Sequence, residues 1–269
     1  MQRKLCLLII IVFLGTGICG FTWKLPKTEL PEASIVLDIN GEVIDGLTRE
    51  NQINLKREEI PQDFVNAIIA VEDKNFYRHP GVDPSGIARA IVTNIKYRKI
   101  IAGGSTITQQ TAKNLFLSSE KTFTRKIKEL VYAIQLERKY SKDEILTMYC
   151  NTIYFGEGAY GVEVAARTFF ARSTDQLSLA QCALLAGLPN SPSNNNPYLH
   201  PETAKKRQAV VLQRMLEEGK IDSRQKKVAL QEKMVYARNS TVAGNAPYFT
   251  ALVKDYLIDK YGQRIVYQG

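Results

Sequence analysis

The sequence predicts a mainly helical domain that begins with a small β element and follows an apolar N-terminal segment. Three observations predict this arrangement. The run Leu5–Gly20 carries no charge, Asn40-Gly41 separates two stretches of alternating apolar residues, and apolar residues recur at helical spacing from Pro61 onward. The composition is that of a folded protein, because 45% of the residues are hydrophobic and 23% are charged.

The N-terminal segment is predicted to be a transmembrane anchor. Arg3 and Lys4 precede an uncharged stretch of about 19 residues, which as a helix would span roughly 28 Å, close to the hydrocarbon thickness of a bilayer. Trp23 suits the membrane interface, and positive charge ahead of the span predicts an N-terminus inside and a body outside. The alternative is a cleaved signal peptide, because small residues gather between Gly15 and Gly20.

The chain is basic, with a formal net charge of +9. A basic balance favours anionic partners, although Lys and Arg residues that simply solvate helix faces would give the same value. We expect no nucleic-acid partner, because the body is predicted to lie outside the cytoplasm. The cysteines form neither a CxxC pair nor a Cys/His cluster, so no zinc site is predicted.

The helical body contains elements with recognisable limits. The apolar face of one helix is formed by Ile127, Leu130, Val131 and Ile134. Ser178 with Gln181 predicts a capping box before an apolar helix that ends near Gly187. A loop rich in Pro, Asn and Ser follows over Leu188–Pro197. Further helices are predicted at 201–218, 223–235 and 247–261.

A carboxylate lies at the edge of the apolar face of the predicted helix Gln62–Lys74. Glu72 follows Ile68 by one turn and is expected to be partly desolvated, which raises the pKa of a carboxyl group and suits it to accept a proton. The turn after this helix contains further side chains able to bind a ligand, namely Asp73, Phe76, His79 and Asp83. The alternative is an ordinary helix C-terminus with polar caps.

Two further segments combine neutral hydrogen-bonding groups with cations. Gly103 and Gly104 permit close backbone approach to a ligand. The side chains that follow them suit sugars and a pyrophosphate: Ser105, Thr106, Thr108, Gln109, Gln110, Lys113 and Asn114. Arg125, Lys126 and Lys128 surround Glu129, which predicts a cationic cradle for phosphate with a carboxylate inside it. The alternatives are an N-capped helix with a polar face and a solvated helix face.

Together these segments resemble the glycosyltransferase domain (glycosyltransferase family 51) of class A penicillin-binding proteins and monofunctional peptidoglycan glycosyltransferases. The resemblance rests on five motifs in the family's order: EDxxFxxHxGxD at 72–83, GGSTITQQTAKN at 103–114, RKxxE at 125–129, a fourth at 142–166 and a fifth at 207–212. It covers roughly residues 34 to 216. Cys150 stands where the family usually has Leu, and Gln208 replaces one cation of the fifth motif.

The resemblance implies a lysozyme-like, mainly helical fold and a hexosyltransferase that polymerises lipid II into glycan strands. Glu72 would be the general base at the acceptor hydroxyl. Glu129 would assist the departure of the polyprenyl pyrophosphate, which leaves with inversion at the anomeric carbon. A divalent cation (Mg or Mn) could be used at the pyrophosphate, but no tightly bound cofactor and no firm metal site are expected. Pyrophosphate contacts are predicted for Lys113 and Arg125, with Lys121 and Arg89 as further candidates. The other predicted substrate-binding residues are Asp73, Phe76, His79, Gly104, Ser105, Thr106, Gln109, Gln110, Asn114 and Lys126.

The resemblance also implies a single-pass protein of the bacterial cytoplasmic (inner) membrane that acts in cell-wall synthesis and accepts moenomycin-type inhibitors. An amphipathic stretch after His79 is expected to dip into the bilayer, through Ile87, Ile91, Ile95, Ile100 and Ile101 with Lys96, Arg98 and Lys99. The predicted organisation is an anchor at 1–24, a linker and β element at 25–60, a catalytic domain at 61–220 and C-terminal helices at 221–269. The last segment resembles the link to a transpeptidase domain, but no SxxK, SxN or KTG trio follows, so penicillin binding is not predicted.

Two other functions remain open at this point. A lysozyme-like hydrolase would share a glutamate and the fold class, but it holds no pyrophosphate and leaves the basic RKxxE segment without a role. A membrane-anchored scaffold with decayed activity would not require the intact Glu72 and Glu129.

Overall fold

The structure, a computed structural model, describes residues 23–26, 34–37, 39, 43–47, 53–97, 103–117, 122–237, 252–253, 256–257 and 259–260. Most of the predicted anchor, the candidate Lys121 and much of the predicted helix 247–261 lie outside these residues. Within the described ranges, no helix is both long and apolar enough to cross a membrane.

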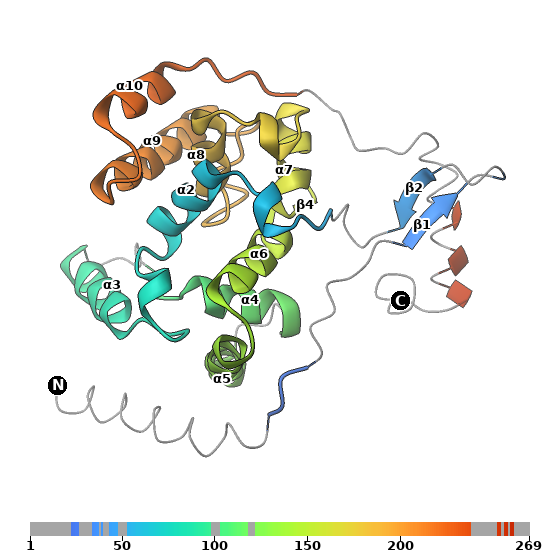
Figure 1. Cartoon of the computed structure of the whole chain (residues 1–269), viewed down its shortest axis with the longest axis horizontal. Coiled ribbons are helices and arrows are strands. Elements are labelled where there is room, and N and C mark those ends of the chain that lie inside the picture. The colour runs from blue at the N-terminus through green and yellow to red at the C-terminus, as the bar shows by residue number, and fades with distance from the viewer. Residues whose placement is uncertain are drawn as a thin grey trace. The chain divides into compact units, whose positions relative to one another are not determined.

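Helices dominate the described chain, as the sequence predicted (Figure 1). The chain divides into two compact units. Unit 1 comprises Met1–Thr28 and Asn75–Leu146, and unit 2 comprises Glu29–Lys74 and Thr147–Gly269. The two units are described one after the other, since each has its own packed helices.

Unit 1 is built on a pair of packed helices, α4 (Ile107–Phe116) and α5 (Phe123–Lys139). Their shared core is formed by Ile107, Ala112, Ala133 and Leu136, all fully buried. Before this pair come the short helix η2 (Phe76–Arg78) and α3 (Pro84–Tyr97). The helix α6 (Lys142–Thr152) follows the pair; it begins in unit 1 and ends in unit 2.

The central helix of unit 2 is α8 (Leu179–Gly187), which is buried from Ala180 to Gly187. It packs against α2 (Gln62–Glu72) and α9 (Pro201–Glu217). A helix with apolar residues on all sides belongs in a protein core. This unit also contains η1 (Arg57–Glu59), β3 (Tyr154–Gly156), β4 (Ala159–Tyr160), α7 (Val162–Phe170), η3 (Thr174–Gln176) and α10 (Ser223–Gln231), together with two strands described next.

Two local predictions are confirmed in unit 2. The Asn-Gly signal is flanked by β1 (Ser34–Leu37) and β2 (Val43–Leu47), which pair antiparallel. The Ser178 hydroxyl accepts a hydrogen bond from the Gln181 N–H at 3.2 Å, and the Gln181 side chain accepts one from the Ser178 N–H at 3.0 Å. Both signals depend on hydrogen bonds between near neighbours in the chain.

The predicted helix 223–235 is too long. Helix α10 ends at Gln231, and residues 232–237 follow without regular secondary structure. The Ala237 N–H donates to the Phe169 carbonyl at 2.9 Å, and the Tyr236 ring stacks on Phe170 with the ring centroids 6.0 Å apart. Pairing with α7 therefore outweighs the helical preference of this segment.

The glycines of the fourth motif form a tight hairpin and a close approach. Glu157 and Gly158 both have positive φ (53° and 70°) at the turn between β3 and β4, as a two-residue hairpin of the primed type requires. At Gly161 (φ 81°), a Cβ atom would lie 2.8 Å from the Asn151 carbonyl oxygen. The Asn151 side chain in turn exchanges two hydrogen bonds with the backbone of Leu55, at 3.0 and 2.8 Å.

Candidate active site

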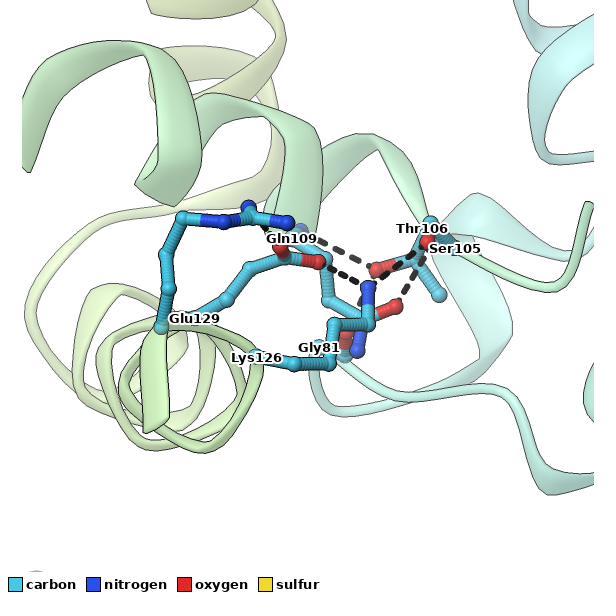
Figure 2. A network of polar contacts seen from close by, with 7 residues as sticks. Gly81, Ser105, Thr106, Gln109, Lys126 and Glu129 are labelled. Carbon is cyan, nitrogen blue, oxygen red and sulfur yellow. Dashed lines mark hydrogen bonds and ion pairs between the residues drawn. The ribbon is translucent and has the colours of Figure 1, made fainter. Parts of the chain in front are cut away.

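The clearest candidate site in unit 1 is built around Glu129, which is 3% exposed in the second turn of α5. Arg125 lies four residues earlier and donates from Nη1 to Glu129 Oε2 at 3.1 Å. Lys126 lies three residues earlier and its ammonium group pairs with Glu129 Oε1 (Figure 2). Helical spacing places all three side chains on one face. The buried carboxylate is thus paired with two of the three cations that the sequence pattern placed around it.

Lys126 also joins this carboxylate to the segment before α4. Its Nζ atom donates to Ser105 Oγ at 2.9 Å as well as contacting Glu129. Figure 2 shows this ammonium group between Ser105 of the second motif and Glu129 of the third. The residue therefore connects two motifs that are separate in the sequence.

Thr106 continues the network toward the first motif. Its hydroxyl donates to the Gly81 carbonyl at 2.6 Å and accepts from the Gln109 N–H at 3.1 Å. The Gln109 side chain accepts from the Thr106 N–H at 2.9 Å, which completes a capping box at the start of α4. Thr106 and Gln109 are 2% and 1% exposed. Both predicted sugar-binding residues thus also have a structural role here, in fixing the N-terminus of α4.

One hydrogen-bond donor of Arg125 has no acceptor within the described residues. This donor is the Nε atom, which is buried. The third motif's other cation is used elsewhere: Lys128 Nζ lies 5.4 Å from the centroid of the Trp23 ring, and Gln135 Nε2 donates to the Trp23 carbonyl at 2.7 Å. The cation pair beside Glu129 therefore consists of Arg125 and Lys126.

Asp83 of the first motif is held at the start of α3. Ser85 Oγ donates to Asp83 Oδ1 at 2.6 Å, and Asn75 Nδ2 donates to Oδ2 at 3.0 Å. Burial alone would raise the pKa of Asp83, but these bonds, the Gly86 N–H and the charge of His79 lower it from 3.8 to about 2. Asp83 is therefore ionised at neutral pH and acts as a helix cap.

The remaining candidates of unit 1 differ in exposure. Phe76 and His79 are buried, at 0% and 8% exposed. A Cβ atom at Gly104 would lie 3.1 Å from Ile87 Cα, so this glycine allows the segment to pass close to α3. The Arg89 side chain is 48% exposed and lies 3.7 Å from Asp83. On α4, Gln110 is half-buried, and two candidates are exposed: Lys113 and Asn114.

Glu72 lies in unit 2, as the last residue of α2, and is half-buried. Its charge acts on two side chains of the same unit. Burial raises the pKa of Tyr149 well above its usual value, and the charges of Glu72 and Asp73 raise it further. Burial lowers the pKa of Arg207, and the charge of Glu72 opposes that change. Asp73 is itself 7% exposed.

Sequence reasoning missed Tyr149 and Arg207 as electrostatic neighbours of Glu72. Tyr149 belongs to α6 and Arg207 to α9, so no local periodicity connects either residue to the end of α2. The available signal was that Tyr149 and Arg207 stand in the fourth and fifth motifs. Both side chains remain without an assigned role in the sequence predictions.

No group of three or more His, Cys, Asp or Glu side chains is placed to hold a metal ion within the described part of the chain. Glu129 is a single carboxylate already paired with two cations. A divalent ion at this position would require oxygen ligands from a bound substrate.

Comparison with known proteins places the chain in a family. The family model Transgly, described as Transglycosylase, matches residues 40–216. The chain is 44% identical over 239 residues to penicillin-binding protein 1A of Aquifex aeolicus, covering 89% of this chain and 33% of that protein. It is 45% identical over 235 residues to penicillin-binding protein 1A of Neisseria meningitidis serogroup B, covering 87% and 29%. It spans about a third of the length of the curated relatives it matches.

A solved structure agrees with the fold. The crystal structure of penicillin-binding protein 1A from Haemophilus influenzae matches with a TM-score of 0.50 at 23% identity, covering 90% of this chain and 26% of that one. The chain belongs to the transglycosylase family, and the predicted resemblance to the glycosyltransferase domain of class A penicillin-binding proteins is confirmed.

Proposed function

We propose that this chain is a peptidoglycan glycosyltransferase that polymerises lipid II and releases polyprenyl pyrophosphate with inversion at the anomeric carbon. The observation that carries the proposal is the cation pair of Arg125 and Lys126 on the buried Glu129, in a chain of the transglycosylase family. Negative charge develops on a departing pyrophosphate, and preorganised cations stabilise such charge most effectively where water is excluded.

Arg125 suits this role because of its unused donor. The buried Nε atom has no acceptor among the described residues, and an unsatisfied buried N–H group costs about 1–3 kcal/mol. A phosphate oxygen would satisfy it, and the planar guanidinium group can bind two such oxygens at once. Lys126 would supply a second positive charge beside Ser105.

The pyrophosphate of a bound substrate would compete with Glu129 for the same two cations, Arg125 and Lys126. A divalent cation, where the reaction uses one, would be held by Glu129 and pyrophosphate oxygens, since Mg and Mn prefer oxygen ligands. The ion would add positive charge at the leaving group. Glu129 itself keeps Arg125 and Lys126 oriented before the substrate binds.

Glu72 is the proposed general base. Its carboxylate would take the proton from the acceptor 4-hydroxyl, whose oxygen forms the new bond to the anomeric carbon as the bond to the pyrophosphate breaks. The charge of Glu72 acts on Arg207 in the same unit, so a cation lies within electrostatic reach of the proposed base. The proton ends on Glu72, and the electron pair leaves with the pyrophosphate.

We propose further that the protein works at the outer surface of the bacterial cytoplasmic membrane. Helix α3 exposes Val92, Ile95 and Tyr97 at 66%, 68% and 57%, with Lys96 among them. Apolar side chains beside a cation suit a helix that lies in the headgroup region of a bilayer. The N-terminal anchor, the single-pass orientation and moenomycin binding stay predictions from the sequence.

The proposal is tested by incubating the full chain in detergent with labelled lipid II, with and without Mg²⁺ or Mn²⁺, and separating products by size. We expect the wild type and the control Glu58→Gln, which alters an exposed carboxylate of unit 2, to give polymer that a muramidase digests. Glu72→Gln should give none. Polymer from Glu72→Gln would move the base elsewhere.

The same assay separates the other functions. A folded wild type that makes no polymer under any of these conditions would contradict the proposal and favour a scaffold. Shortening of preformed glycan strands by the wild type would instead indicate a hydrolase.

A further inference from the structure

We infer that Lys142 and Glu137 form a positioning pair for the proposed reaction, an inference that rests on the proposed function. Lys142 Nζ lies 2.7 Å from Glu137 Oε1, and the two side chains are only 20% and 10% exposed. Neither residue belongs to the predicted site. Glu137 follows Glu129 by two turns of α5, and Lys142 is the first residue of α6.

Lys142 fixes the turn of the first motif from two sides. Its Nζ atom donates to the His79 carbonyl at 2.7 Å and lies 4.4 Å from the centroid of the Phe76 ring. One ammonium group therefore holds the backbone at His79 and the ring at Phe76. Both are predicted substrate-binding residues, so their positions matter for the reaction.

Glu137 connects the same ammonium group to α4 and to Gly81. Thr108 Oγ1 donates to Glu137 Oε1 at 2.5 Å, the same oxygen that pairs with Lys142. Gly81 has a φ of +92°, and a Cβ atom there would lie 3.0 Å from Glu137 Cγ and 3.0 Å from the Ala133 carbonyl oxygen. The turn of the first motif thus rests directly on α5 beside Glu137.

The pair therefore ties together four segments of unit 1: the turn at 79–81 and the helices α4, α5 and α6. The start of α4 is held at two points along α5, since Ser105 binds Lys126 near Glu129 and Thr108 binds Glu137. Loss of the second point would let the start of α4 shift against α5. Such a shift would move Ser105 relative to the Lys126–Glu129 pair.

The contacts of Lys142 and Glu137 distinguish positioning from a role in chemistry. The Lys142 ammonium group is engaged by a carboxylate, a carbonyl and a ring, and Glu137 Oε1 accepts two hydrogen bonds. In a partly buried ion pair of this kind, removal of one partner leaves the other charge uncompensated in a partly desolvated position. The benefit of the pair is a defined arrangement of the groups around it.

The test measures lipid II polymerisation and amide hydrogen exchange on the full chain in detergent. Lys142→Met removes the charge and keeps an unbranched side chain over Phe76. Together with Glu137→Gln and the double variant, it forms a double-mutant cycle. Lys142→Arg is the conservative variant that keeps the charge. The matched control is Lys139→Met, because Lys139 is exposed and lies 4.9 Å from the centroid of the Tyr140 ring.

We expect Lys142→Met to lower kcat by roughly ten- to a hundredfold, the scale of small displacements of reacting groups, and to leave KM within about twofold. Lys142→Arg should recover most of the rate, and the double variant should lose less than the product of the single losses. Amides of residues 76–83 and 104–109 should exchange faster in Lys142→Met than in Lys139→Met, while the amides of α8 stay protected.

An unchanged kcat with unchanged exchange in Lys142→Met would overturn the inference. A rise in exchange that extends through α8 would also overturn it, because the pair would then serve overall stability alone. A wild type that makes no polymer would contradict the proposed function. Amide hydrogen exchange would then decide the inference by itself. Faster exchange in Lys142→Met confined to residues 76–83 and 104–109 would support the inference, and the absence of that rise would refute it.

Discussion

Among the described residues, each unit has a buried glutamate beside an arginine four residues away, yet the two carboxylates are held differently. Glu129 in unit 1 and Glu163 in unit 2 are both 3% exposed. Glu163 accepts from Arg167 Nε at 2.7 Å and from the Thr174 backbone N–H at 2.9 Å. The contacts described for Glu129 come from the side chains of two cations.

The two carboxylates are thus equally buried but are held by different kinds of partner. Glu163 fixes the backbone at the start of η3, and its arginine is 49% exposed to solvent. Arg125 is 18% exposed and keeps a buried N–H group without a partner among the described residues. A carboxylate bound to backbone stabilises the fold, whereas one bound to the side chains of two cations can exchange them with an anionic substrate, although Lys126 is 42% exposed.

The largest effect that separates these two carboxylates should be on activity. Glu129→Gln should lower the rate of lipid II polymerisation by at least about a hundredfold, because the cations at the leaving group lose their orientation. Glu163→Gln should leave the rate of folded protein within about threefold, measured in single-turnover assays. Equal losses from both substitutions would contradict the distinction.

The next effect should be on stability, in the opposite order. Glu163→Ala leaves the Thr174 N–H buried without its acceptor, and we expect a loss of about 2 kcal/mol in the free energy of unfolding. Urea unfolding followed by circular dichroism measures the loss. The control is Glu202→Ala, an exposed position in the first turn of α9, which should change stability by less than about 0.5 kcal/mol. A loss at Glu163 no larger than the control's would argue against a structural role.

A third carboxylate, Asp83, sharpens the comparison because it lies in unit 1 but caps a helix. Its folded pKa of about 2 lies below the usual value of 3.8 for an aspartate, so its stabilisation is complete above about pH 4 and is lost as the pH falls toward 2. The shift corresponds to about 2 kcal/mol. Unfolding free energies between pH 5 and 2 should fall less steeply in Asp83→Asn than in the wild type. Parallel curves would show that Asp83 is not held in this way.

The smallest effects should come from the two matched capping boxes. Ser178→Ala in unit 2 should cost about 1 kcal/mol of unfolding free energy and leave polymerisation unchanged. Thr106→Ala in unit 1 removes a similar cap and also the bond to the Gly81 carbonyl, so it should lower the polymerisation rate as well. Thermal unfolding and the polymer assay together measure both effects. Full activity in Thr106→Ala would show that the Gly81 contact does not matter for the reaction.

Interactions within one helical turn were predictable from the sequence. The spacing of Arg125, Lys126 and Glu129 places the three side chains on one face of any helix, and the Ser178–Gln181 pair caps a helix within a few residues. The Asn-Gly hairpin likewise depends on local backbone geometry. These features follow from chain geometry over a few residues, so they need no knowledge of the packed structure.

The tertiary structure alone decided which distant segments meet. The contacts of Lys126 with Ser105, of Thr106 with Gly81 and of Lys142 with His79 join separate parts of the chain, and no periodicity specifies them. The end of α10 was also decided by packing, because the segment to Ala237 pairs with α7 instead of continuing the helix. The physical reason is that side-chain spacing determines the faces of each helix, whereas the shapes of the packed faces determine which helices touch.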